Sequence, residues 1–364
     1  MERPGRREAA LPGCKKKIRG KEQNMDKAIK NKFDELEKLI GSTPLAEITY
    51  RHKKSEPRTL YFKLEYFNLS GSIKDRMALN ILKCAYENGS LSQDHVITEV
   101  TSGNTGISFC AIGAYLGHKV LIYMPDWMSE ERKGMMRSFG AELRLLSKAQ
   151  GGFKGCLEAV EELKKTDRQI FTPYQFENEN NSLCHYENTG PEISLQLKKA
   201  FNKGAEAVIA GVGTGGTIMG LGRYLKAVNP KAKAYPLEPA SSPTLSTGHK
   251  VGSHRIQGIS DEFIPPILKL AELDEIIDVD DGDSIIMAQK ITRTLGIGLG
   301  ISSGANFLGA VKVQNMLGAD KTVVSVFADD NKKYLSTDLL KEEPVKDGFL
   351  SPDIELLEYR AVTI

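Results

Sequence analysis

The sequence predicts an α/β fold with two lobes, built from wound, mostly parallel sheets and flanking helices. Short apolar segments alternate with amphipathic segments along most of the chain, as strands and helices do in such folds. Glycine-containing loops directly follow several of the apolar segments, where parallel sheets bind their ligands. The 364 residues, 40% of them hydrophobic, are enough to form one large core or two moderate ones.

The individual elements follow from local patterns. A helix is predicted over residues 26–40, where apolar residues recur at helical spacing until Gly41 and Pro44 end it. Amphipathic helices are predicted further along the chain, for example over 129–138 and 155–165. Strands are predicted over 60–64, 96–100, 120–124, 142–146, 207–210, 232–237, 275–279 and 322–327.

Composition argues against several classes of protein. The net charge of +2 gives no bias toward nucleic acid or a membrane surface, and no apolar stretch is long enough to span a bilayer. The five cysteines are odd in number, scattered, and form no CxxC pair, so neither a disulfide framework nor a metal site is predicted. This cysteine usage indicates a reducing, cytoplasmic setting. Residues 1–25 are basic and without apolar periodicity, and we expect them to be a disordered extension.

Lys74 is the first candidate reactive group. It follows Ser70 and Ser72, either of which could cap a helix that starts near Lys74. In the first turn of a helix the dipole disfavours a cation, and a neutral amine is a nucleophile. For an isolated lysine of this kind, a solvated surface position is the alternative.

Two glycine-containing loops are candidate anion sites. Thr101–Gly106 follows a predicted strand and offers hydroxyls, an amide and backbone N–H groups to a carboxylate or phosphate, although a capped turn would look the same. Gly211–Thr217 contains the pattern GxGxxG, and Glu238 follows near the spacing of a ribose-binding acid, which favours a nicotinamide dinucleotide. With Thr214 and Thr217, the same loop suits a single phosphate monoester equally well.

Taken together, these segments resemble the cysteine synthase family, the β-replacement branch of pyridoxal-phosphate enzymes with the tryptophan-synthase-like fold. The resemblance extends from about Leu39 to about Leu335. The matching segments occur in family order at 41–45, 70–76, 99–106, 124–125, 175–176, 189–193, 211–217, 238–239, 256–259 and 300–304.

The resemblance implies a role for each matched residue. Lys74 would bind pyridoxal 5′-phosphate covalently and then act on the substrate's α-proton. Asn104 would hydrogen-bond the ring hydroxyl, and Ser302 would face the pyridine nitrogen. The residues that would hold the phosphate are Gly213, Thr214, Gly215, Gly216 and Thr217. Those that would bind the substrate's α-carboxylate are Thr101, Ser102, Thr105 and Gln175.

The implied reaction is β-replacement on an L-serine-type substrate or on cysteine, through an aminoacrylate. O-acetylserine with sulfide is the default pair for the family, with phosphoserine and serine as further substrates. A hydroxyl at the pyridine nitrogen does not favour the pyridinium, so loss of a β-leaving group is preferred over racemisation and transamination. A nicotinamide dehydrogenase remains as a remote alternative, and it would leave Lys74 and Ser302 without a role.

Asp261 departs from the family pattern, which has small or aromatic residues at this position. A carboxylate there could orient a water or an incoming amine, or act as a general base. The enzyme would then act on cysteine itself, release sulfide, and form serine or lanthionine. A solvated acid paired with a nearby lysine or arginine is the alternative.

The resemblance also implies a domain organisation and partners. Residues 26–67 and 179–337 would form a large cofactor-binding lobe, 68–178 a small mobile lobe, and 338–364 a C-terminal tail. A homodimer is expected, as is a complex with serine acetyltransferase through that enzyme's C-terminal peptide.

Overall fold

The computed structural model describes residues 25–260 and 263–364. Residues 1–24, which make up nearly all of the predicted basic extension, therefore lie outside the described residues, and so does Asp261. Among the described residues, no helix combines the length and the apolar character needed to cross a bilayer.

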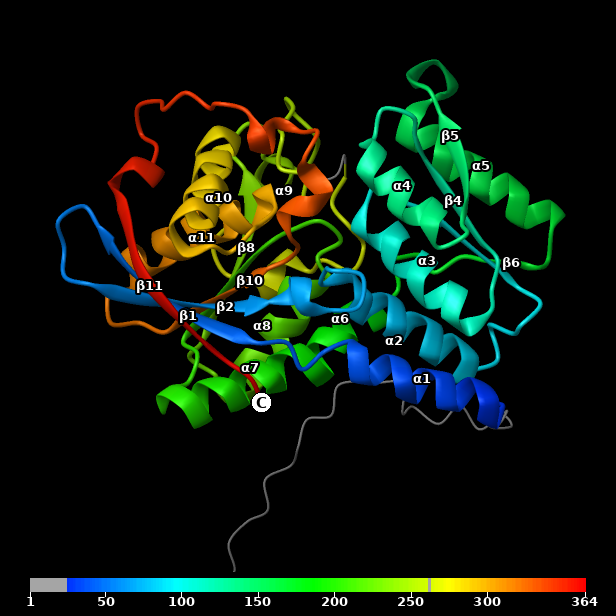
Figure 1. Cartoon of the computed structure of the whole chain (residues 1–364), viewed down its shortest axis with the longest axis horizontal. Coiled ribbons are helices and arrows are strands. Elements are labelled where there is room, and N and C mark those ends of the chain that lie inside the picture. Colours follow the sequence, from blue (N-terminus) through cyan, green and yellow to red (C-terminus); the bar gives the residue numbers. More distant parts are fainter. Residues whose placement is uncertain (1–24, 261–262) are drawn as a thin grey trace, which may run out of the picture.

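The larger of two sheets has seven strands in the order β11-β1-β2-β10-β7-β8-β9 (Figure 1). Its strands β2, β10, β7, β8 and β9 run parallel, while β1 is antiparallel to both of its neighbours. The bounds are β1 Leu45–His52, β2 Arg58–Leu64, β7 Ala207–Gly211, β8 Lys233–Pro239, β9 Ile277–Val279, β10 Val323–Phe327 and β11 Ile354–Val362.

The smaller sheet has four parallel strands in the order β5-β4-β3-β6. Figure 1 shows it beside the larger sheet, with α3, α4 and α5 around it. Its strands are consecutive in the sequence, and their bounds are β3 Val96–Val100, β4 Val120–Pro125, β5 Glu142–Leu146 and β6 Ile170–Phe171. The confirmed fold class is therefore α/β, with two mostly parallel sheets.

Helices cover both faces of the large sheet. The core on one face is formed with α10 and α11, and the core on the other face with α7 and α8. The helices α1, α2 and α3 share a third core with the small sheet. The helix bounds are α1 Lys27–Leu39, α2 Lys74–Glu87, α3 Asn104–Leu116, α4 Glu130–Ser138, α5 Gly152–Thr166, α6 Asn180–Cys184, α7 Gly190–Gln196, α8 Gly216–Val228, α9 Thr244–Thr247, α10 Asp281–Leu295 and α11 Ile301–Leu317.

All eight predicted strands are confirmed to within a few residues, and so is the helix over 26–40. The strands β1, β6 and β11 were not predicted. Most side chains of β11 are exposed because it lies at the edge of the sheet, so its sequence lacks a clear apolar alternation. The prediction that Ser70 or Ser72 caps the helix near Lys74 is wrong. The N-cap of this helix, α2, is Ile73, and Lys74 is its first residue. Ser72 nevertheless contributes, because its Oγ accepts a hydrogen bond from the Lys74 backbone at 3.3 Å.

A buried network of ion pairs fixes the start of α2 against the large sheet. Arg76 Nε donates to Glu65 at 2.6 Å, and Arg76 Nη2 pairs with Glu192 of α7 at 2.8 Å. Glu192 also pairs with Lys63 of β2 at 2.8 Å. Burial alone would raise the pKa of Glu65, but the charge of Arg76 outweighs it and holds that pKa below its ordinary value. Because Lys74 and Arg76 share the first turn of α2, the network also determines where Lys74 lies.

Replacing Arg76 with methionine should destabilise the protein by about 3–5 kcal/mol, because Glu65 and Glu192 would remain buried without their main partner. Urea unfolding followed by circular dichroism measures this loss. Glu162→Gln, which breaks an exposed pair with Lys165, is the matched control and should leave the unfolding midpoint in place. A midpoint for Arg76→Met equal to that of the control would show that the network does not stabilise the fold.

Stability should fall in acid as Glu192 becomes protonated. Burial would raise the pKa of Glu192, but bonds and charge from Arg76 and Lys63 lower it from 4.5 to about 2. A carboxyl whose pKa is lowered by folding stabilises the native state above its ordinary pKa, and this contribution is lost as the pH falls from about 4.5 toward 2. Unfolding midpoints across this range should decline less steeply for Glu192→Gln than for the wild type. Parallel declines would contradict this assignment.

Candidate active site

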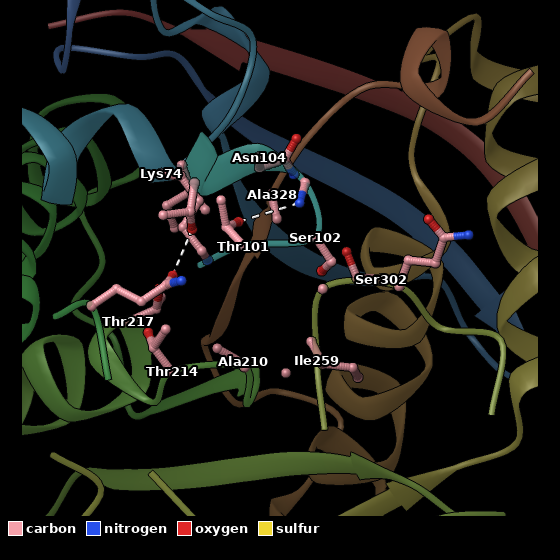
Figure 2. Close-up of a pocket in the computed structure, with 18 of the residues that line it drawn as sticks. Lys74, Thr101, Ser102, Asn104, Ala210, Thr214, Thr217, Ile259, Ser302 and Ala328 are labelled. Carbon is pink, nitrogen blue, oxygen red and sulfur yellow. Dashed lines mark hydrogen bonds between the residues drawn. The ribbon is translucent and has the colours of Figure 1, made fainter. Parts of the chain in front are cut away.

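A cavity of about 900 Å³, a volume that includes its open mouth, is lined by residues from loops and helices next to both sheets. Figure 2 shows side chains from α2, from the loops that lead into α3 and α8, and from α11 around the same space. The predicted site residues that line it are Lys74, Thr101, Ser102, Asn104, Thr105, Gln175, Gly213, Thr214, Thr217 and Ser302. Gly215 and Gly216 belong to the same loop as Thr214 but do not line the cavity.

Lys74 is held at the cavity by the segment that follows β10. The backbone N–H of Ile73 donates to the carbonyl of Ala328 at 2.9 Å, and Ser72 forms an isolated antiparallel bridge with Asp329. Lys74 is half-buried at the first position of α2. The loop before α2 is thus tied to the large sheet immediately before the lysine.

The loop after β3 places uncharged donors at one side of the cavity. Thr101 Oγ1 accepts a hydrogen bond from the Gly103 backbone at 3.3 Å, and α3 begins at the next residue. Thr105 Oγ1 donates to Gln175 Oε1 at 2.6 Å, and Gln175 Nε2 donates to the carbonyl of Val100 at 3.2 Å. Gln175, far along the chain, is therefore brought to the threonines with which the resemblance grouped it. The remaining hydroxyls and N–H groups suit a carboxylate.

Glu99 lies directly behind this loop and was not predicted as part of the site. Its carboxylate accepts from the backbone of Val100 at 2.9 Å and from that of Gln175 at 3.4 Å. Burial raises the pKa of Glu99 to about 8. The Glu99 side chain does not line the cavity, and it supports the position of Gln175 through the Gln175 backbone.

The loop Gly211–Thr217 forms a close-fitting cup. A Cβ added to Gly213 would lie 2.4 Å from the carbonyl oxygen of Gly258, and one added to Gly216 would lie 2.0 Å from Asn181 Oδ1. Gly215 has a φ of +85°, and α8 starts at the next residue, so its first N–H groups face the loop. This arrangement fits a phosphate group at a helix N-terminus.

Two side chains from α6 and the following turn, which were not predicted as site residues, support this cup. Asn181 Nδ2 donates to Thr214 Oγ1 at 2.9 Å, and His185 Nε2 lies 3.4 Å from Thr217 Oγ1. Burial and then the charge of Arg76 lower the pKa of His185 to about 3, so this imidazole is neutral near pH 7. His185 therefore acts on Thr217 as a neutral partner.

Asn104 and Ser302 complete the wall of the cavity. Asn104 Nδ2 donates to Asp329 Oδ2 at 2.6 Å, whereas Asn104 Oδ1 is buried without a hydrogen-bond partner among the described residues. A ring hydroxyl would satisfy that oxygen, because a buried polar atom without a partner is costly. Ser302 lies in the first turn of α11 and lines the cavity. With the phosphate cup, these residues fit pyridoxal phosphate.

Glu238 has another role than the one that a dinucleotide would require. It accepts hydrogen bonds from the backbones of Leu245 at 2.7 Å and Ser246 at 3.3 Å, at the start of α9. It is 1% exposed and is not part of the cavity wall. The glycine pattern of Gly211–Thr217 therefore lacks the ribose-binding acid of a nicotinamide site.

Comparisons with known proteins agree with this geometry. The family model "Pyridoxal-phosphate dependent enzyme" matches residues 36–329. A probable cysteine synthase of Bacillus subtilis is 40% identical over 83% of this chain and 96% of its own length. The solved structure of a hydrogen sulfide-producing enzyme from Fusobacterium nucleatum has a TM-score of 0.89 and 53% identity, covering 92% of this chain and 100% of that one.

A cysteine synthase from Entamoeba histolytica superposes with a TM-score of 0.78 and 35% identity over 87% of this chain and 94% of that one. These matches confirm the predicted resemblance and the predicted cofactor. The chain belongs to the family of pyridoxal-phosphate-dependent enzymes, in the group that includes the cysteine synthases.

Proposed function

We propose that this enzyme catalyses β-replacement on an L-serine-type amino acid, and that its reaction is that of a cysteine synthase, which joins O-acetylserine and sulfide. The observation that carries this proposal is that Lys74 lines one cavity together with Ser302, residues of the loop Gly211–Thr217 and residues of the loop after β3. The probable cysteine synthase of Bacillus subtilis and the cysteine synthase of Staphylococcus aureus, at 40% and 38% identity, support the same reaction.

Each residue has a defined task in this proposal. When bound, pyridoxal phosphate supplies the electron sink for removal of the β-substituent. Lys74 would hold the cofactor in the resting enzyme, and its Nζ would take the α-proton of the bound substrate. The hydroxyl of Ser302 would lie at the ring nitrogen and, unlike a carboxylate, would not stabilise its protonated form, which favours elimination over racemisation.

The carboxylate loop also controls access of water. Thr101, Ser102, Thr105 and Gln175 bind the α-carboxylate of the substrate, and we propose that residues 68–178 move as a small lobe when it binds. Their closure on the large lobe, residues 26–67 and 179–337, would exclude water from the reacting atoms.

Lys74→Ala tests the central assignment. The purified wild-type enzyme should show a violet absorption band that borohydride bleaches, and it should form cysteine from O-acetylserine and sulfide. Lys74→Ala should lack the band and lose nearly all of this activity, because no amine remains to bind the cofactor or to move the α-proton. Absorption spectra and a cysteine assay measure both. A wild-type protein that binds nicotinamide dinucleotide and has no violet band would refute the proposal.

A second candidate function is production of sulfide from cysteine, with water or a thiol as the entering group and serine or lanthionine as the product. The 53% identity to a hydrogen sulfide-producing enzyme favours it. An aspartate-to-asparagine variant of that enzyme has been solved with an α-aminoacrylate intermediate. We propose that Asp261 is the residue that orients or deprotonates the entering group in this reaction.

The role of Asp261 can be measured with cysteine as the only substrate. Wild type should release sulfide, and Asp261→Asn should do so at least about tenfold more slowly if the carboxylate acts as a general base. Asp278, an exposed acid on β9, provides the control variant Asp278→Asn, which should release sulfide at the wild-type rate. Equal rates for wild type and Asp261→Asn would remove Asp261 from the reaction, and no sulfide from either would leave plain cysteine synthesis.

We also propose partners and a setting for the enzyme. A homodimer, and a complex with serine acetyltransferase, are expected from the likeness to cysteine synthases. A cytoplasmic location is supported by the cysteines, because the four that the structure describes are buried and form no disulfide among the described residues.

A further inference from the structure

Arg132, on α4, is a buried cation in the wall of the active-site cavity. It is 4% exposed and lines the cavity beside Ser102 and Gly103. Its Nη1 donates to the carbonyl of Ser102 at 3.5 Å, which is a weak contact, and its guanidinium stacks 4.9 Å from the centre of the Tyr334 ring. In the described part of the chain, its Nε has no hydrogen-bond partner. None of these contacts neutralises the charge.

Two other buried cations of the protein have carboxylate partners close by. Arg76 lies between Glu65 and Glu192, and Lys133, the residue after Arg132, pairs with Glu130 at 2.8 Å. A charge removed from water without a partner is costly, so a fold that retains one benefits when an anion arrives. Because Arg132 is located in the cavity wall, that anion is expected to be a ligand of the cavity.

The position of Arg132 indicates which anion it meets. A Cβ added to Gly103 would lie 3.2 Å from Arg132 Nε, so the guanidinium packs directly against the loop after β3. That loop offers hydroxyl and amide groups but no charge of its own, as the sequence Thr101–Thr105 makes plain. Building on the proposed function, we propose that Arg132 supplies the positive charge that attracts and holds the α-carboxylate of the amino-acid substrate.

Two contacts fix Arg132 in this place. The neighbouring Glu131 accepts hydrogen bonds from Ser336 N at 2.8 Å and from Ser336 Oγ at 2.7 Å, which joins α4 to the segment after β10. Tyr334, under the guanidinium, donates its hydroxyl to Asp329 Oδ2. Asp329 contacts Tyr334 and Asn104, and among the described residues it forms no ion pair with Arg132. If Asp329 neutralised the charge of Arg132, the enzyme would bind ligands with and without an α-carboxylate equally well at the loop after β3.

The test compares two ligands that differ only in the carboxylate. L-serine and L-serinamide are titrated into the holoenzyme while the absorption of the bound cofactor is followed. Arg132→Gln should weaken the affinity for L-serine by at least about tenfold, because one partner of a buried charge pair is lost. The affinity for L-serinamide should change by less than about twofold. Arg132→Lys, which keeps the charge, should retain most of the affinity for L-serine.

Two further variants make the result decisive. Arg132→Met replaces Arg132→Gln if the latter does not hold the cofactor, since an apolar chain of similar volume is tolerated at buried ionic positions. Lys133→Gln removes the adjacent buried cation, and it should not alter the ratio of the two affinities.

The possible outcomes separate the proposals. An equal loss of affinity for both ligands in the neutral variants would assign Arg132 a purely structural role. Unchanged affinities for both would show that its charge does not act on the ligand. Either result overturns the inference while the violet band and the wild-type response to L-serine remain. If the wild type responds to neither ligand, the proposed function fails, and the inference fails with it.

Discussion

The ion pairs that Arg76 makes with Glu65 and Glu192 are the constraint on which the site depends. They join the end of β2, the first turn of α2 and α7 in a region from which water is excluded. Lys74 is two residues before Arg76, so its backbone position is set by the large sheet even though α2 packs with the helices of the small one. Burial is the main cause of the lowered pKa of His185, the imidazole beside Thr217, and the charge of the same arginine lowers that pKa further. One buried cation therefore influences both the position of Lys74 and the imidazole beside Thr217.

The segment after β10 has a comparable role on the other side of the cavity. Ala328 bonds to the backbone before Lys74, and its own N–H donates to Ser303 Oγ at 3.0 Å. Asp329 binds Asn104 at 2.6 Å from the opposite direction. The elements that carry Lys74, Ser302 and Asn104 are thus connected through two consecutive residues.

Much of the fold and the site could be predicted because short sequence motifs contain most of the site residues. Gly213, Thr214 and Thr217 belong to one loop. Their residue types indicate a backbone that comes close to its neighbours and hydroxyl groups that suit an anion. The supporting residues could not be predicted in this way. Asn181 and His185 reach Thr214 and Thr217 only after α6 packs against α8, and nothing in their own neighbourhood in the sequence signals this contact. Glu99 resembles any strand residue until its burial is known.

The edge strand β11 has a consequence for how the protein is made. It pairs with β1 along the whole of that strand, with Leu45 opposite Val362, so two segments from distant parts of the chain are neighbours in the sheet. During synthesis β1 is completed early and can pair with β2, but its other side has no partner until the ribosome has passed residue 362. Over that interval the nascent chain presents open hydrogen-bonding groups that invite pairing with other chains. The pairing of β11 with β1 can therefore form only after nearly the whole chain has been synthesised.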